Sequence, residues 1–226
     1  GEKPLSVEAG PGAGKTRVII ERVKYLLNEK KVAPESMLII TFTRKAADEL
    51  KDRLSKDDIA KSDIDLMQIS TIHGFCSRIL QESGAIGFDV IDDDLNEKNN
   101  MFISKHLKDL GFVDEFTVKP RDVRDIVRKY NEYTTFKVDT KCLTEYIKET
   151  RPISMEYLTF VKNYMEENDG KFPFNEIHDD KDLKKSYYNA KYLKIAESYP
   201  KYLQLLEDEN LTDFSLMQVN TLKHLE

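Results

Sequence analysis

The pattern of apolar and polar residues changes character near residue 90 of the chain. In residues 1–90, short apolar runs alternate with stretches in which apolar residues recur at every third or fourth position. The short runs predict β-strands and the longer stretches predict amphipathic helices. Strands and helices that alternate in this way are typical of a parallel sheet, so we expect an α/β fold. In chain order the predicted elements are a strand over 4–9, a helix over 16–30, a strand over 37–43, a helix over 44–56, a strand over 66–71 and a helix over 72–83.

From residue 91 onward only the helical spacing continues. Asp94 with Glu97 predicts a capping box near the start of this region, and Thr212 predicts a cap for its last helix. Pro200 predicts a kink or break in its longest helix. We expect a core over 1–90, a large all-helical subdomain inserted over 91–208, and a helix over 209–226 that returns to the core. The helical segments are 102–110, 120–133, 154–168, 183–209 and 212–226.

The stretch VEAGPGAGKTR, Val7 to Arg17, places three glycines between a predicted strand and a predicted helix. Glycines permit a loop whose backbone N–H groups turn inward, and the helix N-terminus adds the positive end of its dipole, so an anion site results. Lys15 adds a full charge for phosphate oxygens, and the Thr16 hydroxyl can ligate Mg²⁺. The alternative is a glycine-rich turn without a ligand. The predicted contacts to ATP and Mg²⁺ are Gly10, Pro11, Gly12, Ala13, Gly14, Lys15, Thr16 and Arg17.

Composition narrows the class of protein without deciding its ligand. With 40% hydrophobic and 34% charged residues, the 226-residue chain reads as globular, and no apolar run is long enough to cross a membrane. Its two cysteines, Cys76 and Cys142, are far apart, which favours a reducing, cytoplasmic setting over a disulfide framework. The net charge of −6 argues against a simple basic nucleic-acid binder. Residues 1–90 are formally neutral, however, which leaves room there for a local positive face.

Four segments together resemble the superfamily 1 DNA helicases of the UvrD/Rep type. The glycine loop is similar to their first motif, in which alanine is usual at Ala9, where the general phosphate-loop pattern has glycine. The segment TFTRKAADELKDRL is similar to a T-F-T-N-K-A-A-x-E-M motif, with Arg44 and Leu50 as departures. STIHGFCSRIL is similar to a T-F-H motif with Ile72 in place of phenylalanine, and LTDFSLMQ to a segment that precedes the second ATPase motif.

The resemblance implies a RecA-like P-loop NTPase core that carries a helical insertion. It implies ATP hydrolysis coupled to 3′→5′ movement along single-stranded DNA, with Lys15 and Thr16 acting at the phosphates and the metal. The partners would be single-stranded DNA and duplex junctions. The residues that would contact the strand are Phe42, Thr43, Arg44, Thr71 and His73.

The resemblance also implies parts that this sequence does not contain. An adenine-binding glutamine motif would precede Val7, and an acidic D-E-x-Q-D motif and a second motor domain would follow Glu226. We therefore expect an N-terminal fragment, consisting of the first motor domain with its inserted subdomain, that is inactive by itself. The alternatives are a DNA-independent P-loop NTPase, such as a small-molecule kinase, and a non-catalytic helicase-like subunit.

Several candidate residues also have a structural interpretation. Phe42 would then be buried, Thr43 and Thr71 would cap helices, and His73 would be a structural histidine. Arg17 would lie beside the nucleotide or pair with Glu21. Zinc at His73 and Cys76 would need two further ligands at metal spacing, and these are missing from the sequence. A basic stripe would contact DNA or form a solvated face paired with Asp122 and Asp125; it consists of Lys119, Arg121, Arg124, Arg128 and Lys129.

Overall fold

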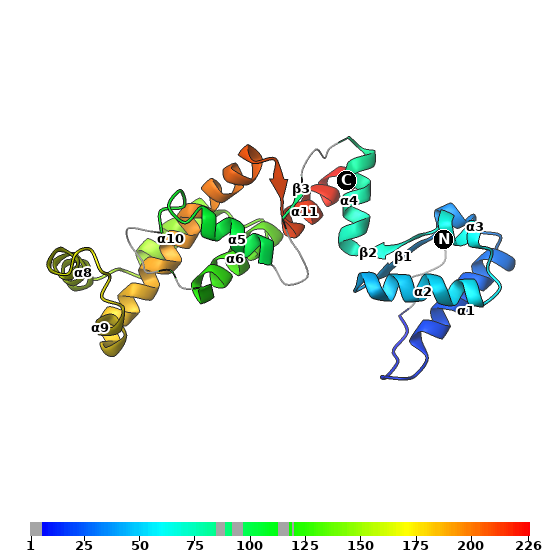
Figure 1. The fold of residues 1–226 in the computed structure, drawn as a ribbon, viewed down its shortest axis with the longest axis horizontal. Helices are drawn as coiled ribbons and strands as arrows, with labels where there is room; N and C mark the ends of the chain where they lie inside the picture. The colour runs from blue at the N-terminus through cyan, green and yellow to red at the C-terminus, as the bar shows by residue number, and fades with distance from the viewer. Residues whose placement is uncertain (1–5, 85–88, 92–96, 113–117, 119) are drawn as a thin grey trace. The chain divides into compact units, whose positions relative to one another are not determined.

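A computed structural model of the chain describes residues 6–84, 89–91, 97–112, 118 and 120–226. The chain divides into two compact units, Gly1–Glu82 and Ser83–Glu226. Figure 1 colours the first unit from blue to cyan and the second from green to red. Asp94 of the predicted capping box and Lys119 of the basic stripe lie outside the described residues.

The first unit alternates helices with two short strands. Its elements are α1 (Lys15–Asn28), the 3₁₀ turn η1 (Pro34–Ser36), β1 (Leu38–Thr41), α2 (Arg44–Lys56), α3 (Lys61–Leu66), β2 (Gln68–Thr71) and α4 (Ile72–Glu82). β1 and β2 pair in parallel, with Leu38 opposite Gln68 and Thr41 opposite Thr71. The two strands predicted over 37–43 and 66–71 are therefore confirmed, as is their parallel order.

The strand predicted over 4–9 is wrong in its described part, because residues 6–9 form no strand. Val7, its one β-branched residue, is 58% exposed. The small side chains of Val7 and Ala9 bury too little surface to hold a strand that has no paired neighbour among the described residues.

A hydrophobic core holds the helices of the first unit on its sheet. Ile20 and Val23 come from α1, Leu50 and Leu54 from α2, and Ile69 from β2; all five are buried. Their spacing of three or four residues along each helix is the pattern that predicted these helices. Along β1, exposed and half-buried side chains alternate. Leu38 and Ile40 are the exposed ones, so one face of this strand is uncovered among the described residues.

The second unit consists mostly of helices around one long helix. Its elements are β3 (Asp89–Val90), α5 (Glu97–Lys105), α6 (Pro120–Thr135), α7 (Thr140–Thr150), α8 (Met155–Glu167), α9 (Phe174–Asp179), α10 (Lys181–Asp208), β4 (Leu211–Thr212) and α11 (Phe214–Leu225). α10 packs against α6, α7, α8 and α9. The helices predicted over 120–133, 154–168, 183–209 and 212–226 are confirmed within a few residues at their ends.

Of the kink or break predicted at Pro200, the break does not occur, since α10 runs continuously from Lys181 to Asp208, while a kink there stays a prediction. An interior proline costs a helix roughly 3 kcal/mol through a lost hydrogen bond and a steric clash. The residues around it recover that energy by burial: Tyr199, Tyr202 and Leu206 all lie in the core of the second unit.

Stacked tyrosines and their hydrogen bonds fix α6 against α10. The rings of Tyr130 and Tyr202 stack with centroids 4.5 Å apart. The Tyr130 hydroxyl shares a 2.7 Å hydrogen bond with Ser198, and Thr134 shares one of 2.8 Å with Tyr199. Burial raises the pKa of Tyr130, so its hydroxyl stays neutral at any physiological pH.

The last elements of the chain pack within the second unit. β4 pairs in parallel with β3, a two-residue bridge that is too short to produce a sequence pattern. α11 packs on α6. Its N-cap is Asp213 rather than the predicted Thr212, since the Asp213 carboxylate accepts a 2.7 Å hydrogen bond from the Leu216 N–H group. A return of residues 209–226 to the core over 1–90 stays a prediction, as does the insertion of residues 91–208 into it.

Candidate functional site

The glycine loop ends at the N-terminus of α1, as the sequence predicts. Gly12 and Gly14 have φ angles of 74° and 82°, a left-handed conformation that favours glycine. Gly14 is the residue before the helix, and its carbonyl accepts the first helical hydrogen bond from Val18 at 3.1 Å. A Cβ atom added at Gly10, Gly12 or Gly14 would meet nothing within 4 Å. The two left-handed glycines thus shape the loop, and the space beside it is open to a ligand.

Lys15 folds back over this loop. Its ammonium group donates hydrogen bonds to the backbone carbonyls of Ala9, at 3.0 Å, and Gly10, at 2.8 Å. A polyphosphate would offer that ammonium group charged oxygens in place of neutral ones, so a direct attraction between opposite charges would be added to each hydrogen bond. The open loop, the ammonium group and the helix N-terminus together fit the terminal phosphates of a nucleotide.

Thr16 and Arg17 lie in the first turn of α1. Thr16 is half-buried, and its hydroxyl is of the oxygen-ligand type that Mg²⁺ prefers. Arg17 is exposed and, within the described part of the chain, forms no ion pair with Glu21. The structural interpretation of Arg17, an ion pair with Glu21, is therefore not supported. The positive charge of Arg17 remains available to a ligand at the start of α1.

The two strand ends lie together at one edge of the sheet. Because β1 and β2 are parallel and Thr41 is the register partner of Thr71, the residues that follow both strands leave the same edge. The carboxyl ends of parallel strands are where open α/β sheets bind ligands. Phe42 is 99% exposed at this edge, so its interpretation as a buried side chain is wrong. His73 is half-buried in the first turn of α4.

Two threonine hydroxyls at this edge cap the helices that follow them. Thr43 Oγ1 accepts a 3.1 Å hydrogen bond from the Ala46 N–H group, and Thr71 Oγ1 accepts one of 3.2 Å from the Gly74 N–H group. The predicted capping role of both threonines is confirmed. The sequence reasoning did not single out Thr41, whose hydroxyl donates to the Thr43 carbonyl at 2.9 Å. The only feature of the sequence that could have pointed to Thr41 is that a threonine stands on each side of Phe42.

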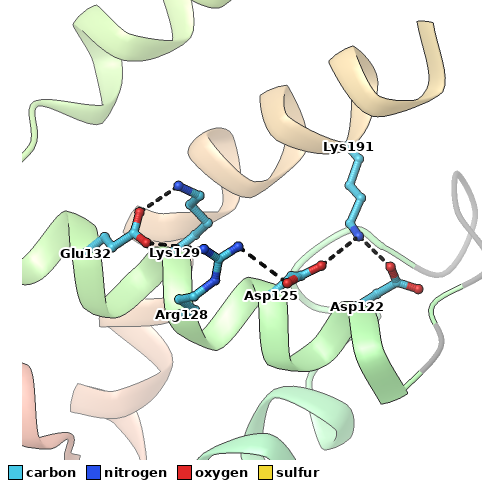
Figure 2. A network of polar contacts seen from close by, with 6 residues as sticks. All are labelled: Asp122, Asp125, Arg128, Lys129, Glu132 and Lys191. Atoms are coloured by element: carbon cyan, nitrogen blue, oxygen red, sulfur yellow. Dashed lines mark hydrogen bonds and ion pairs between the residues drawn. The ribbon is translucent and has the colours of Figure 1, made fainter. Parts of the chain in front are cut away.

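The basic stripe is neutralised over part of its length, as Figure 2 shows. Arg128 lies 3.5 Å from Asp125 and 3.7 Å from Glu132, and Lys129 lies 2.6 Å from Glu132. The interpretation as a paired, solvated face is confirmed for Arg128 and Asp125. Asp122 instead pairs with the buried Lys191 of α10.

The described residues also limit other kinds of site. Cys76 is buried, Cys142 is exposed, and neither forms a disulfide bond within the described residues. Within the described ranges there is no group of three or more His, Cys, Asp or Glu residues placed to hold a metal ion. No helix in these ranges is both long enough and apolar enough to cross a membrane.

Comparison with known proteins matches the chain to one family over its whole length and to individual relatives over part of it. Residues 1–226 match the family described as the UvrD/REP helicase N-terminal domain. The chain is 41% identical over 140 residues to a probable DNA helicase II homolog of Mycoplasma pneumoniae, an alignment that covers 62% of this chain and 18% of that protein. It is 45% identical over 96 residues to the ATP-dependent DNA helicase PcrA of Staphylococcus aureus, covering 40% of this chain and 13% of that protein. The chain thus spans less than a fifth of the length of these relatives.

Proposed function

We propose, from the premise that this chain belongs to the family of UvrD/REP helicase N-terminal domains, that it supplies the ATP-binding part of the first motor domain of a DNA helicase. The whole protein would couple ATP hydrolysis to 3′→5′ movement along single-stranded DNA. The matched relatives are named as DNA helicases, and one is named as ATP-dependent.

The glycine loop would hold the phosphates of ATP. Backbone N–H groups of the loop and of the first turn of α1 would surround them, and Lys15 would exchange its two carbonyl partners for phosphate oxygens. Thr16 would help to hold Mg²⁺, which when bound would supply positive charge against the negative charge of the phosphates. Arg17, exposed beside the loop, would add a further positive charge.

The sheet edge would hold the DNA strand. Phe42 offers an exposed ring on which an unpaired base can stack, and Arg44 offers a guanidinium group to a phosphate. The hydroxyl groups of Thr43 and Thr71 each cap a helix, which holds both residues in place. Their backbone groups would therefore be the ones that contact the DNA. The observation that carries the proposal is the register of β1 with β2, which brings both predicted contact segments to one edge.

Calorimetry of ATP and Mg²⁺ binding tests the nucleotide site. Lys15→Ala should weaken binding roughly 10- to 150-fold, the loss expected when one hydrogen-bonding charged group is removed. Lys45→Ala is a matched control because it removes an exposed lysine from α2, outside the glycine loop. Equal affinity of the wild type and Lys15→Ala would show that the loop is not the nucleotide site.

A further inference from the structure

The exposed side chain of Phe42 takes its position from the backbone on either side of it. Because this side chain is almost fully exposed, packing against the protein does not fix its orientation. Phe42 and Thr43 form the two-residue link between the end of β1 at Thr41 and the start of α2 at Arg44. Any contact that orders this link therefore also orders the aromatic side chain that it carries.

The hydroxyl group of Thr41 closes this link. Its Oγ1 atom donates a 2.9 Å hydrogen bond to the backbone carbonyl of Thr43, so a side chain at the end of the strand is joined to the backbone two residues later. Phe42 lies inside the closed loop of atoms that results. Threonine favours local bonds of this kind, because its short side chain brings the hydroxyl group close to neighbouring backbone groups.

Thr43 is held from the side of the helix as well. Its carbonyl accepts the first hydrogen bond of α2, from the Ala47 N–H group at 3.1 Å, and its hydroxyl accepts one of 3.1 Å from the Ala46 N–H group. The Thr43 carbonyl is thus the atom at which β1 and α2 are joined. Without the Thr41 hydroxyl this carbonyl would keep its helical donor, so α2 would still begin here and only the connection to the strand would be lost.

The end of β2 has a similar bond but no projecting residue. The Ser70 hydroxyl donates to the Thr71 carbonyl at 3.2 Å, and Thr71 is followed at once by Ile72, the first residue of α4. A side-chain hydroxyl therefore bonds to a backbone carbonyl at the end of each strand, and of these two strands only β1 has a link before its helix. This contrast indicates that at β1 the bond acts on the residue that the link carries, which is Phe42.

We propose that Thr41 is a positioning residue, which holds Phe42 in the orientation in which a base of single-stranded DNA stacks on it. The proposal rests on the proposed function for its ligand and adds to it a residue that acts without touching the DNA. A side chain that is already oriented loses less conformational freedom when a base stacks on it, so the strand binds more tightly. The cost of ordering one side chain on binding corresponds to roughly a three- to tenfold change in affinity.

A double-mutant cycle between Thr41 and Phe42 tests this role in the 226-residue chain. Thr41→Val keeps the β-branched shape of the side chain and removes the hydroxyl group. We expect it to weaken the binding of an oligothymidylate roughly three- to tenfold, as measured by fluorescence anisotropy. In the Phe42→Ala background the same substitution should have no further effect. Thr41→Ser keeps the hydroxyl group and should bind nearly as tightly as the wild type.

Thr150→Val is the matched control. The exposed Thr150 hydroxyl also donates to a backbone carbonyl, that of Tyr146 at 2.7 Å, but it lies on α7 in the second unit. This variant loses the same kind of bond away from the sheet edge, so it should bind the oligothymidylate as the wild type does. A loss equal to that of Thr41→Val would show that the position of the hydroxyl group does not matter and would overturn the proposal.

Backbone order parameters, measured by NMR relaxation without DNA, give a second readout. In Thr41→Val the order parameters of the Phe42 and Thr43 amides should fall, because the link is no longer joined to the strand. The order parameter of Ala47 should stay at its wild-type value, which also shows that α2 is folded. Unchanged order parameters at both link amides would overturn the positioning role before any DNA is added.

The binding results separate this role from the proposed function. Equal losses from Thr41→Val in both backgrounds would show that Thr41 acts on the DNA directly, and weak binding by Thr41→Ser would show that the hydroxyl group is not the cause. Either result overturns the positioning role. Wild-type affinity of Thr41→Val beside weak binding by Phe42→Ala overturns it too, but leaves the proposed function intact. Wild-type affinity of Phe42→Ala would remove the stacking contact from the proposed function, and the role of Thr41 with it.

Discussion

The large aromatic side chain of Phe42 is not buried by the fold of its own unit and so contributes little to its stability. Burying such a ring contributes about 1.5–3 kcal/mol to stability, yet Phe42 is 99% exposed at the end of β1. The apolar pattern alone could not show this, because an apolar residue that ends a β-rich run normally extends the buried side of the strand, and only the family resemblance placed Phe42 against a ligand. The glycine loop was predictable for the opposite reason: its conformation follows from the residue type itself at Gly12 and Gly14.

Phe42→Ala should weaken binding of single-stranded DNA roughly 5- to 150-fold, the range that corresponds to one stacked base. It should change the free energy of unfolding by no more than about 0.5 kcal/mol, because the ring contributes so little burial. Fluorescence anisotropy with a labelled oligothymidylate measures the first quantity, and thermal unfolding measures the second. Tyr146→Ala serves as the control, since it truncates an exposed aromatic residue on α7.

A companion change at the same edge separates stacking from charge. Arg44→Glu should weaken binding at low salt and have much less effect at high salt, because a phosphate contact acts through counterion release. If Phe42→Ala binds as tightly as the wild type while Arg44→Glu does not, the strand would pass over this edge without stacking there.

At the scale of whole elements, prediction succeeded where periodicity extended over many residues. The long helices α6 and α10 and the β-rich runs around β1 and β2 each carry enough apolar positions to define a buried face. Prediction failed for elements that are stabilised mainly by tertiary packing. The burial of Tyr199 and Tyr202 maintains α10 through Pro200, and the bridge between β3 and β4 joins two-residue segments about 120 residues apart.

Asp213 ties the last helix to α10 through both of its carboxylate oxygens. One oxygen accepts from the Leu216 N–H group at 2.7 Å, and the other accepts from the Tyr202 hydroxyl at 2.7 Å. Asp213→Ala should lower the free energy of unfolding of the second unit by about 2–4 kcal/mol, since it removes an N-cap and leaves a buried hydroxyl without its acceptor. Asp213→Asn keeps a capping oxygen and should cost about 1 kcal/mol.

Tyrosine fluorescence measures this change in the second unit. The chain has no tryptophan, and Tyr25 is the only one of its 11 tyrosines within residues 1–82. Urea titration followed by tyrosine emission therefore reports residues 83–226. If Asp213→Ala and Asp213→Asn unfold at the same urea concentration as the wild type, the carboxylate contributes nothing to the attachment of α11.

For the molecule as a whole, charge is divided between the two units. Residues 1–82 hold 14 Lys and Arg against 13 Asp and Glu, while residues 83–226 hold 21 against 28. An acidic unit repels a DNA strand at long range, so any contact with it has to be local. On α6, Arg128 and Lys129 are already paired with Asp125 and Glu132, so these two bases do not offset the acidic balance of the second unit.

A polypeptide of residues 1–226 should bind ATP without DNA-stimulated turnover. Phosphoryl transfer in P-loop enzymes needs a carboxylate for the metal, a group that orients the attacking water, and arginines worth roughly 10³–10⁵ in rate. The sequence provides Lys15 and Thr16 but no D-E-x-Q-D segment. Asp213, the acid of the segment that resembles the approach to that motif, is 0% exposed, and its carboxylate accepts hydrogen bonds from Tyr202 and from the Leu216 N–H group. Phosphate release measured with and without oligothymidylate checks this expectation, with Lys15→Ala as the background control. Turnover that DNA stimulates and Lys15→Ala abolishes would mean that another carboxylate of these 226 residues holds the metal.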